Sequence, residues 1–522
     1  MITQIEIENF KGIGRNVKID LRPITLMFGA NSAGKSSVIQ SLHYLREILV
    51  HDNPNPGATN SGGSFVDLGG FDRFVHNHDI NSKIRLRVHL NVSAIHFPEY
   101  LRGGADEYVG YPRSEISQNI HSSSIEFVIS KRNKQVHCSE YLSSLNGSLF
   151  ARILSTDGMN ENQCQLHVNM DHPLLDKEFE SERNWDQQQF ADCVAKTQGA
   201  IVRSKCNGNE MIFDLKTARN AIPAWGVPLE IDFQKHSDMD TDLIVTEGLS
   251  QLIVGPLDSL RRQLSNFLYI GPLREIPTRN HENKLNRDPR RWASGIAAWD
   301  SLHECSLDDL NEINVWLSGN DRLDSKNCIV RKKFQSIEID SEESFRLLHS
   351  ASNSVTVEEL RNLIWSGQSS TRLYIKSPTS GQLDVCDVGV GLSQLIPILV
   401  MAIIEEEPIN AIEQPELHLH PRLQAALGDV LLHAIANHSN RIFLVETHSE
   451  HLILRILRRI RETHNKELPS FLHKVDPESI AVHFLESTPL GVKATRLRID
   501  EEGEFADRWP YGFFDERSEE LF

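Results

Sequence analysis

Hydrophobic and polar positions at the start of the chain predict three strands and a helix. Residues 2–7 and 17–21 alternate apolar with polar side chains, which is typical of strands with one buried face. Residues 24–28 form an unbroken apolar run, as expected for a strand buried on both faces. After a glycine-rich stretch, apolar residues recur at helical spacing at Val38, Leu42, Leu45 and Leu49. The predicted order is therefore strand, glycine-rich turn and helix.

The pattern changes in the middle of the chain and becomes strong again near the end. Strands are predicted at 84–90 and 124–129, and the segments around them are polar and weakly periodic. Past residue 380 we expect an apolar helix with Pro397 in its first turn, where proline is tolerated. Two buried strands follow, at 409–412 and 441–446.

These patterns predict an α/β head, a mixed sheet with flanking helices, that is split by a large insertion. The head is formed by the first and last parts of the chain, the insertion is β-rich with some helix, and a mixed α/β segment returns to the head. The four predicted parts are 1–75, 76–260, 261–380 and 381–522. In the return segment, Arg274 follows a strand and a Gly-Pro turn, so it either reaches a nucleotide phosphate or starts a helix paired with Glu275.

Residues 29–36 read Gly-x-x-x-x-Gly-Lys-Ser, the pattern of a phosphate-binding loop. Glycines let successive backbone N–H groups turn inward around phosphate oxygens, and the start of the next helix offers further N–H groups to the same anion. We expect Lys35 to reach the β- and γ-phosphates and the Ser36 hydroxyl to bind Mg²⁺. The predicted nucleotide-binding residues here are Gly29, Asn31, Ser32, Ala33, Gly34, Lys35, Ser36 and Ser37.

A second group of polar residues follows about 350 residues later. Gly391, Ser393 and Gln394 open the apolar helix, whose start is suited to holding an anion. The strand at 409–412 ends in Glu413-Gln414-Pro415-Glu416, and carboxylates at a strand end beside a phosphate-binding loop can bind Mg²⁺ or act as a general base. The strand at 441–446 is followed by His448, which can contact the γ-phosphate or the attacking water.

Taken in this order, the motifs resemble the ATP-binding-cassette superfamily, and within it the soluble SMC, RecF and overcoming-lysogenization-defect type ATPases. The phosphate-binding loop lies far along the chain from the glycine–serine segment at 388–394, which is called the signature in this superfamily. This long separation suits that branch, in which an insertion splits the head. The match is closer to one bacterial ATPase family, which includes the PtuA-type ATPases of the Septu anti-phage system and accompanies some retrons. The segments that carry it are 30–37, 269–275, 388–394, 412–421, 446–451 and 509–517.

The resemblance implies an ATPase that uses ATP and Mg²⁺ and dimerises with ATP sandwiched between two copies. Separately, the first residues show no basic-then-apolar signal pattern, so we expect the chain to be cytoplasmic. Gly391 and Ser393 of one copy would face the γ-phosphate held by Lys35 of the other. The implied partners are a second copy of the chain and an HNH-type nuclease effector that the ATPase gates. Nucleic acid, either retron or phage, is a further possible partner through local basic patches. An alternative is a DNA-repair or DNA-bridging ATPase of RecF/SMC type that has no nuclease partner.

The acidic strand end departs from the pattern of transport ATPases, which carry Asp-Glu there. The corresponding residues are Glu413 and Gln414, and a second acid follows at Glu416. We expect Glu413 to bind Mg²⁺ with Ser36 and Glu416 to act as the base. Glutamine cannot accept a proton from water, so Gln414 at most orients it, and hydrolysis should be slow.

Composition, charge and the lack of certain motifs argue against several other functions. The net charge of −18 disfavours nucleic-acid binding over the whole surface, although local basic clusters remain candidates. The longest apolar run, 395–404, is too short to span a bilayer, and we expect no membrane contact. A GTPase is disfavoured because no Asn-Lys-x-Asp string is present, and an SMC-type arm because residues 80–260 show no sustained heptads. The basic clusters are 131–134, 290–291, 331–333 and Arg455 with Arg458 and Arg459.

Overall fold

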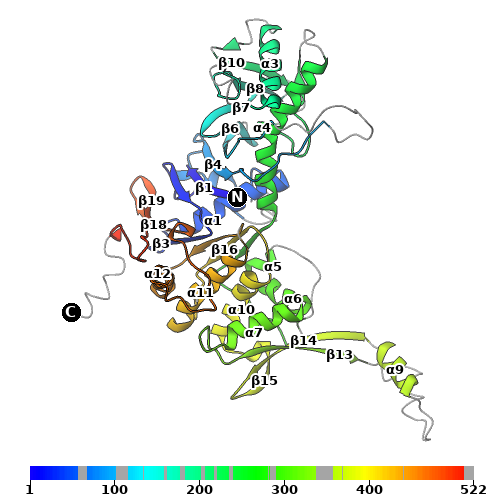
Figure 1. Ribbon diagram of the computed structural model, residues 1–522, viewed down its shortest axis with the longest axis vertical. Helices are drawn as coiled ribbons and strands as arrows, with labels where there is room; N and C mark the ends of the chain where they lie inside the picture. The colour runs from blue at the N-terminus through cyan, green and yellow to red at the C-terminus, as the bar shows by residue number, and fades with distance from the viewer. Residues whose placement is uncertain are drawn as a thin grey trace.

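Three β-sheets follow one another along the long axis of the molecule in the computed structural model (Figure 1). We call them the upper sheet, the head sheet and the arm sheet. The structure describes residues 1–56, 67–101, 116–132, 135–157, 162–176, 183–200, 206–207, 209–216, 220–233, 239–279, 281, 290–336, 357–366, 368–438 and 440–510. Residues 511–517, which belong to the last of the segments that carry the family resemblance, lie outside this part of the chain.

The upper sheet has ten strands, is antiparallel throughout, and joins the N-terminal strands to the whole β-rich region. The weakly periodic middle of the chain is thus one continuous meander. Its alternation is real but modest: in one strand Cys164, Leu166 and Val168 are buried between glutamine and histidine side chains. In spatial order the strands are β11 (Ile231–Asp232), β10 (Glu210–Leu215), β8 (Asn162–Asn169), β7 (Ser148–Asp157), β6 (Gln135–Leu145), β5 (Ser122–Arg132), β4 (Ile84–Asn91), β1 (Ile2–Glu8) and β2 (Val17–Asp20), with β9 (Cys206–Asn207) beside β10.

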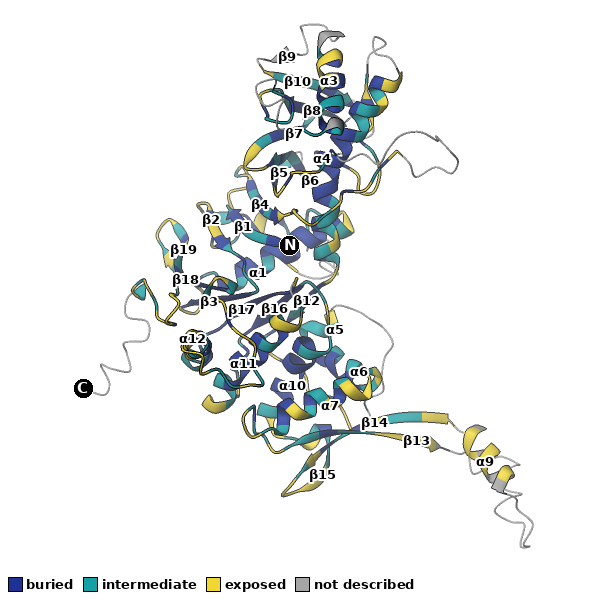
Figure 2. Ribbon diagram, in the orientation of Figure 1, coloured by how far each residue is buried: buried dark blue, intermediate teal, exposed yellow. Residues whose placement is uncertain are grey.

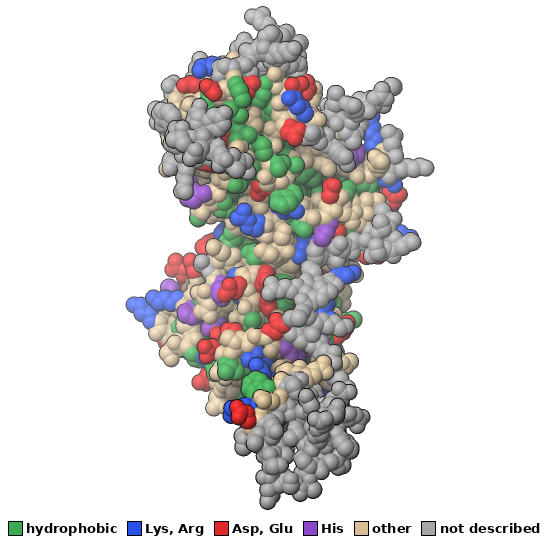
Figure 3. All heavy atoms as spheres, turned by 90° about the vertical axis from the view of Figure 1, so that its right-hand side faces the viewer, with side chains coloured by type: hydrophobic (Ala, Val, Ile, Leu, Met, Phe, Trp, Pro, Cys, Tyr) green, Lys and Arg blue, Asp and Glu red, His purple; other side chains and the backbone are tan. Residues whose placement is uncertain are grey.

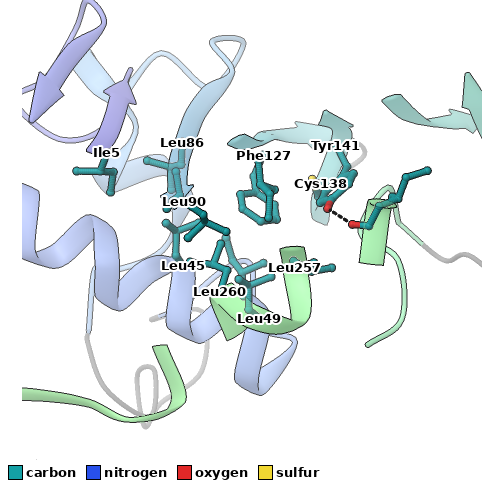
Figure 4. Packing of buried hydrophobic residues seen from close by; sticks show 14 of the residues in the cluster. Ile5, Leu45, Leu49, Leu86, Leu90, Phe127, Cys138, Tyr141, Leu257 and Leu260 are labelled. Carbon is teal, nitrogen blue, oxygen red and sulfur yellow. Dashed lines mark hydrogen bonds between the residues drawn. The ribbon is translucent and has the colours of Figure 1, made fainter. Parts of the chain in front are cut away.

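Two helices pack on this sheet and connect it to the head. Figure 4 shows Leu45 and Leu49 of α1 (Lys35–His51) meeting Leu257 and Leu260 of α4 (Met239–Ser265) beside side chains of the sheet. Farther along α4, the Tyr141 hydroxyl donates a hydrogen bond to the Ile253 carbonyl, 2.8 Å away. Burial of each such apolar side chain contributes about 1.5–3 kcal/mol. The helix that begins at Lys35 is therefore held firmly against α4 and the upper sheet.

Two features of the structure bear on the predicted division of the chain into four parts. The predicted boundary at residue 260 falls inside α4, and the N-terminal strands β1 and β2 share a sheet with the predicted insertion. A third helix of the region, α3 (Trp185–Ala200), packs against α4. Two short elements, α2 (Phe71–Phe74) and η1 (His76–His78), precede β4.

The head sheet has six strands, of which the first five are parallel. Their carboxyl ends therefore meet at one edge of the sheet, where ligands of open α/β sheets bind. The strands expected at 24–28, 409–412 and 441–446 are present in it, together with the strand expected before the Gly-Pro turn that leads to Arg274. In spatial order they are β12 (Phe267–Ile270), β16 (Ile409–Glu413), β17 (Ile442–Glu446), β3 (Ile24–Gly29), β18 (Ile480–Thr488) and the antiparallel β19 (Gly491–Leu497).

Two hydrophobic cores lie on opposite sides of the head sheet. Ile24, Leu26 and Phe28 of β3 pack into one core with three helices, while Met27 packs into the core shared with the upper sheet. This alternation explains the unbroken apolar run of a strand that is buried on both faces. The three helices are α10 (Val390–Ile403), α11 (Pro421–Asn437) and α12 (Glu450–His464).

The position expected for Pro397 is wrong. Helix α10 begins at Val390, so Pro397 lies two turns inside it rather than in the first turn. A proline there has no N–H for the carbonyl of Ser393, four residues earlier. The helix continues because its side chains are almost all buried, including every residue from Leu395 to Ala402. Tertiary packing thus outweighs the cost of one missing backbone bond.

The arm sheet has three antiparallel strands, β13 (Cys328–Ser336), β14 (Gln368–Ser377) and β15 (Gly381–Asp384). Helices α6 (Ile296–Glu304) and α7 (Leu307–Ser318) contact it, and α5 (Arg290–Ala293) precedes them. Strands β13 and β14 extend away from the head toward α9 (Val357–Ser366), and Figure 2 shows this end of the molecule as largely exposed.

Surface character differs between the two ends of the molecule. On the face drawn in Figure 3, hydrophobic side chains gather over the upper part, whereas acidic and basic side chains are intermixed lower down. Among the described helices, none is both long enough and apolar enough to cross a membrane.

Candidate nucleotide site

The glycine-rich loop between β3 and α1 has the backbone conformation that only glycine adopts readily. Gly29 and Gly34 have φ values of 144° and 94°. A Cβ on Gly29 would lie 2.1 Å from the Leu485 carbonyl oxygen, and one on Gly34 would lie 2.5 Å from Val492 Cγ2. Both glycines are thus required by neighbouring strands as well as by their own φ. Within the loop, Asn31 and Ser32 are exposed, and Ala33 and Ser37 are buried.

Helix α1 begins at Lys35 with no side chain capping its first N–H groups. These groups and the positive end of the helix dipole are suited to an anion. The Lys35 ammonium donates to the carbonyls of Gly29 and Ala30, at 2.9 Å each, and lies 3.8 Å from Glu446 Oε1. Ser36 Oγ donates to Glu446 Oε2 at 2.7 Å. The two residues predicted to bind phosphate and Mg²⁺ are therefore both held at one carboxylate.

Two glutamates from neighbouring parallel strands stand side by side at this edge. Glu413 ends β16 and Glu446 ends β17, and they are paired in register. Burial raises the pKa of Glu413 to about 7, and the charge of Glu446 adds to the shift. Burial also raises the pKa of Glu446. The Tyr269 hydroxyl hydrogen-bonds Glu413. Two buried carboxylates held this close favour a bound cation.

Glu416 lies beside the end of β17 and is oriented by two hydrogen bonds. Its Oε2 accepts from Thr447 Oγ1 and its Oε1 accepts from the backbone N–H of His448, both at 2.7 Å. Burial lowers the pKa of His448, and Lys35 lowers it further. The buried Nε2 of His448 has no hydrogen-bond partner among the described residues. The arrangement fixes a carboxylate next to a histidine that has one unused polar atom.

Gln414 occupies the turn between these two acids. Its φ is 45°, unusual for a residue with a side chain, and its N–H donates to the Glu446 carbonyl at 2.8 Å. This turn separates Glu413 from Glu416, so that one acid ends β16 and the other reaches the residues after β17.

The predicted signature residues lie at the start of α10, but two of the three are buried. Ser393 is fully buried and its hydroxyl donates to the Val390 carbonyl at 2.8 Å. Gln394 is also buried, and its Nε2 donates to the Arg274 carbonyl at 2.9 Å. A Cβ on Gly391 would lie 2.9 Å from the His418 carbonyl oxygen. The exposed start of the helix consists of Gly389 and Val390.

Arg274 does not serve either of the roles expected for it. Its guanidinium is buried and donates to the carbonyls of Glu413, Gln414 and Gln394, at 2.9, 3.3 and 3.4 Å. Burial lowers its pKa to about 10. Its Nη1 and Nη2 atoms are used by these carbonyls, and no ion pair with Glu275 is present among the described residues. It instead ties the start of α10 to the acidic turn after β16.

The residues at this edge fit a magnesium-bound nucleoside triphosphate. The glycine cradle and the open helix start suit phosphates, the unpartnered His448 nitrogen suits the terminal phosphate, and Glu413 with Glu446 and Ser36 suits Mg²⁺. Groups of three or more His, Cys, Asp or Glu side chains that could hold a metal by themselves are absent from the described part of the chain. A Mg²⁺ ion here would therefore take further ligands from phosphate and water.

The chain was compared with known families and structures. It matches the family described as "AAA ATPase domain" over residues 1–222 and 280–453. The chain belongs to this family. Residues 475–522 match a second family, described as "Protein of unknown function (DUF3696)". No curated protein matches the chain in sequence. Membership of the AAA ATPase domain family, split in two segments, agrees with the split α/β P-loop fold expected from the sequence.

Solved structures that resemble this AAA ATPase include SMC head domains. An SMC head bound to the C-winged helix domain of ScpA has a TM-score of 0.38 and 10% identity, covering 96% of this chain and 98% of that one. The SMC head from Thermotoga maritima has a TM-score of 0.35 and 9% identity, covering 96% and 99%. At these TM-scores the likeness adds nothing to the fold argued from the sheets.

Two residues of this AAA ATPase site were missed by the sequence reasoning. Glu446 was placed at a strand end but given no role, although it contacts both Lys35 and Ser36. Tyr269 was seen only as part of a matching segment, although it binds Glu413. The available signal was that both central strands end in glutamate. Acids at the carboxyl ends of adjacent parallel strands must lie together.

Proposed function

We propose that the protein is an ATPase that binds MgATP at the edge of the head sheet and closes as a dimer over it. One observation carries this proposal: the loop lysine and serine, the paired Glu413 and Glu446, and the Glu416–His448 pair all meet at that edge. These are the positive, metal-binding and proton-accepting groups that phosphoryl transfer to water requires.

Each residue has a chemical role in this proposal. Lys35 exchanges the carbonyls of Gly29 and Ala30 for the β- and γ-phosphates. Ser36, Glu413 and Glu446 hold Mg²⁺, which neutralises phosphate charge when bound. Glu416, oriented by Thr447 and the His448 N–H, accepts a proton from the attacking water.

Slow hydrolysis is part of the proposal, since Glu416 already accepts two hydrogen bonds. Each of its two carboxylate oxygens already accepts a hydrogen bond, so an attacking water must share one of these oxygens with Thr447 or with the His448 N–H. Gln414 contributes at most to orienting the water. A slow ATPase spends much of its cycle in the closed, nucleotide-bound state, which suits a switch better than a motor.

Dimer closure would use the exposed start of α10. Gly389 and Val390 present backbone N–H groups at a helix start, which is suited to the phosphate of a second copy. Gly391 lies one residue further in. Ser393 and Gln394 would join this contact only after a rearrangement, because their polar groups are bonded inside the subunit.

We further propose that the closed dimer gates a separate HNH-type nuclease in bacterial anti-phage defence. The support for this step is the resemblance of the sequence motifs to Septu- and retron-associated ATPases. The second candidate, a DNA-repair or DNA-bridging ATPase of RecF/SMC type, shares the same closed dimer but has no nuclease partner. Purification of the tagged chain from its native operon, with mass spectrometry of bound proteins, separates the two. Recovery of no nuclease would reject the first.

The ATPase proposal is tested by separating hydrolysis from closure. Glu416→Gln should lower ATP turnover by about 100-fold or more, since a base contributes about 10²–10⁴-fold, and should leave ATP binding intact. Val390→Arg, on an exposed side chain, should preserve ATP binding but abolish ATP-dependent dimerisation measured by light scattering. Leu490→Arg, another exposed apolar position, is the matched control. Unchanged turnover in Glu416→Gln, or normal dimerisation in Val390→Arg, would contradict the proposal.

A further inference from the structure

One face of the arm sheet carries cations and aromatic rings together. The opposite face packs through Ile329, Leu373 and Ile375, which are buried. Alternation along the strands and the pairing of β13 with β14 then define the outward face. We call it the arm face, and its residues are Lys332, Phe334, Arg372, Tyr374 and Lys376.

Among the described residues, the charges of the arm face have no acidic partner. Lys332 and Arg372 are directly opposite each other across the two strands, an arrangement that is destabilising for like charges. Within the described residues, neither they nor Lys376 lie within 4 Å of a carboxylate. The polar partner of Lys332 is the neutral amide of Gln382. A like-charge pair with no acidic partner in the described part of the chain is an arrangement that an anionic ligand would stabilise.

The other basic clusters found in the sequence differ from the arm face in this respect. Arg455 and Arg459 both bond buried Asp429, and Arg458 bonds Glu462. Lys131 bonds Asp72. Arg291 bonds Asp300, and Arg331 donates to backbone carbonyls of α6 and the residue that follows it. In the part of the chain that the structure describes, the arginines and lysines just named on α12, β5, α5 and β13 thus have carboxylate or carbonyl partners within the subunit, unlike the cations of the arm face.

The rings and cations of the arm face alternate. Lys332 Nζ lies 5.5 Å from the centre of the Tyr374 ring, and Arg372 Cζ lies 5.5 Å from that of Phe334. The two rings are 6.4 Å apart, and Phe334 is exposed. Cations that bind phosphates, next to rings on which bases stack, are the chemistry of single-stranded nucleic-acid binding. Because the whole chain has a net charge of −18, this basic surface is a local exception to its acidic character.

The arm sheet leads directly to the start of α10. Strand β15 passes through η4 (Val385–Asp387) to Gly389, which caps α10. Arg279 bonds both Asp384 of β15 and Asp387 of η4, so the two short elements are held as a unit. A ligand that shifts β15 would therefore shift the exposed helix start.

We propose that the arm face binds single-stranded nucleic acid and that its occupancy is transmitted through β15 and η4 to the start of α10. The binding step goes beyond the proposed ATPase function and does not depend on it. The transmission step rests on that function, because it acts through dimer closure.

Binding is tested on the full chain without nucleotide, by fluorescence anisotropy with labelled oligo(dT) and oligo(U). Lys332→Glu should weaken binding about tenfold or more. It should also reduce the salt dependence, by about 0.7 in the slope of log K against log salt for each phosphate that the variant no longer binds. The substitution turns the like-charge pair with Arg372 into an ion pair. The arm should therefore not unfold, which a thermal melt will verify.

Lys333→Glu is the matched control. It makes the same change of charge one residue away, on the opposite face of the same strand, and should change affinity less than about twofold. Phe334→Ala should weaken binding by about fivefold or more, because bases can no longer stack on the ring. Three results would overturn the proposal: no binding at low salt, an equal effect of Lys333→Glu, or equal affinity for duplex DNA or for poly-glutamate.

Transmission is tested with Arg279→Ala, which removes the link between β15 and η4. In the presence of MgATP, oligonucleotide should shift the monomer–dimer equilibrium of the unmodified chain. Arg279→Ala should retain oligonucleotide binding and lose that shift. A shift that persists in Arg279→Ala would overturn transmission, while a chain that binds oligonucleotide but never dimerises would reject the ATPase proposal and leave the binding site intact.

Discussion

Two buried glutamates, one in the upper sheet and one in the head sheet, have opposite electrostatic surroundings. Glu6 in β1 accepts hydrogen bonds from Asn16 and Lys18 and contacts His89, so that its pKa falls to about 2 although burial alone would raise it. Glu413 in β16 has its pKa raised to about 7 by burial and by Glu446 beside it. Both are nearly inaccessible to solvent.

The difference separates a structural charge from a functional one. The partners of Glu6 complete its hydrogen bonds, so the fold keeps it ionised at a net gain. Glu413 is short of positive charge, because Lys35 lies closer to Glu446 and Arg274 bonds backbone carbonyls instead. Two carboxylates in this condition support the proposed Mg²⁺ site, to which the ion would come with its phosphate ligand. Substitutions at the two sites test this contrast.

The largest effect is expected for Lys35→Ala. Loss of the ammonium at the loop should weaken ATP binding by about 100-fold or more, as the removal of a charge-assisted hydrogen bond from a buried site implies. Isothermal titration calorimetry with ATP measures it. Lys18→Ala, which removes the lysine beside Glu6, should leave the affinity unchanged. If the two variants bind ATP equally well, Lys35 has only the structural role that Lys18 has.

The next effect is expected for Glu6→Gln, which should destabilise the fold at pH 7 by about 1–3 kcal/mol. The folded pKa of Glu6 is lowered from 4.5 to about 2, so its contribution is complete above about pH 4.5 and is lost as the pH falls toward 2. Urea unfolding followed by circular dichroism should show that the gap in the free energy of unfolding between variant and wild type closes over that pH window. A gap that is independent of pH would show that altered packing, not charge, is responsible.

The smallest effect is expected for Glu413→Gln. It changes the free energy of unfolding in the direction opposite to Glu6→Gln, toward greater stability. A raised folded pKa means that the folded state holds more protons than the unfolded state between about pH 4.5 and 7, so stability falls as pH rises there. At pH 8, removal of this charge should stabilise the nucleotide-free chain by about 0.5–1 kcal/mol. The same variant should gain less stability than wild type from MgATP in a thermal melt. If Glu413→Gln instead destabilises the chain at pH 8, then the charge of Glu413, like that of Glu6, stabilises the fold.

The features of the site that are local in sequence could be predicted, and those set by topology could not. The loop at 29–36 and the strands that end at Glu413 and Glu446 follow from periodicity and residue type. That these two glutamates are neighbours depends on β16 and β17 pairing in parallel, which no local pattern specifies. The burial of Ser393 likewise depends on how α10 is rotated about its axis by packing against the head sheet and α6.

The division into sheets was also beyond local patterns. The strands β1 and β2 lie just before β3 in the sequence, yet they belong to the upper sheet, while β3 belongs to the head sheet. Alternation predicts that a strand has a buried face but not which sheet covers it. The projecting arm is similar: the sequence predicts only a mixed α/β segment there, and the pairing of β13 with β14 is what shows that the outward face carries paired cations.

The pairing of β3 has a consequence for how the protein is made. The phosphate-binding strand lies between β17 and β18, and Ser36 contacts Glu446, which is 410 residues farther along the chain. A ribosome that has completed β3 still has to synthesise both neighbouring strands before the head sheet can close around it. Contacts of such long range form slowly and late. During synthesis the upper sheet can fold first, and the nucleotide site matures only when nearly all of the described chain has been translated.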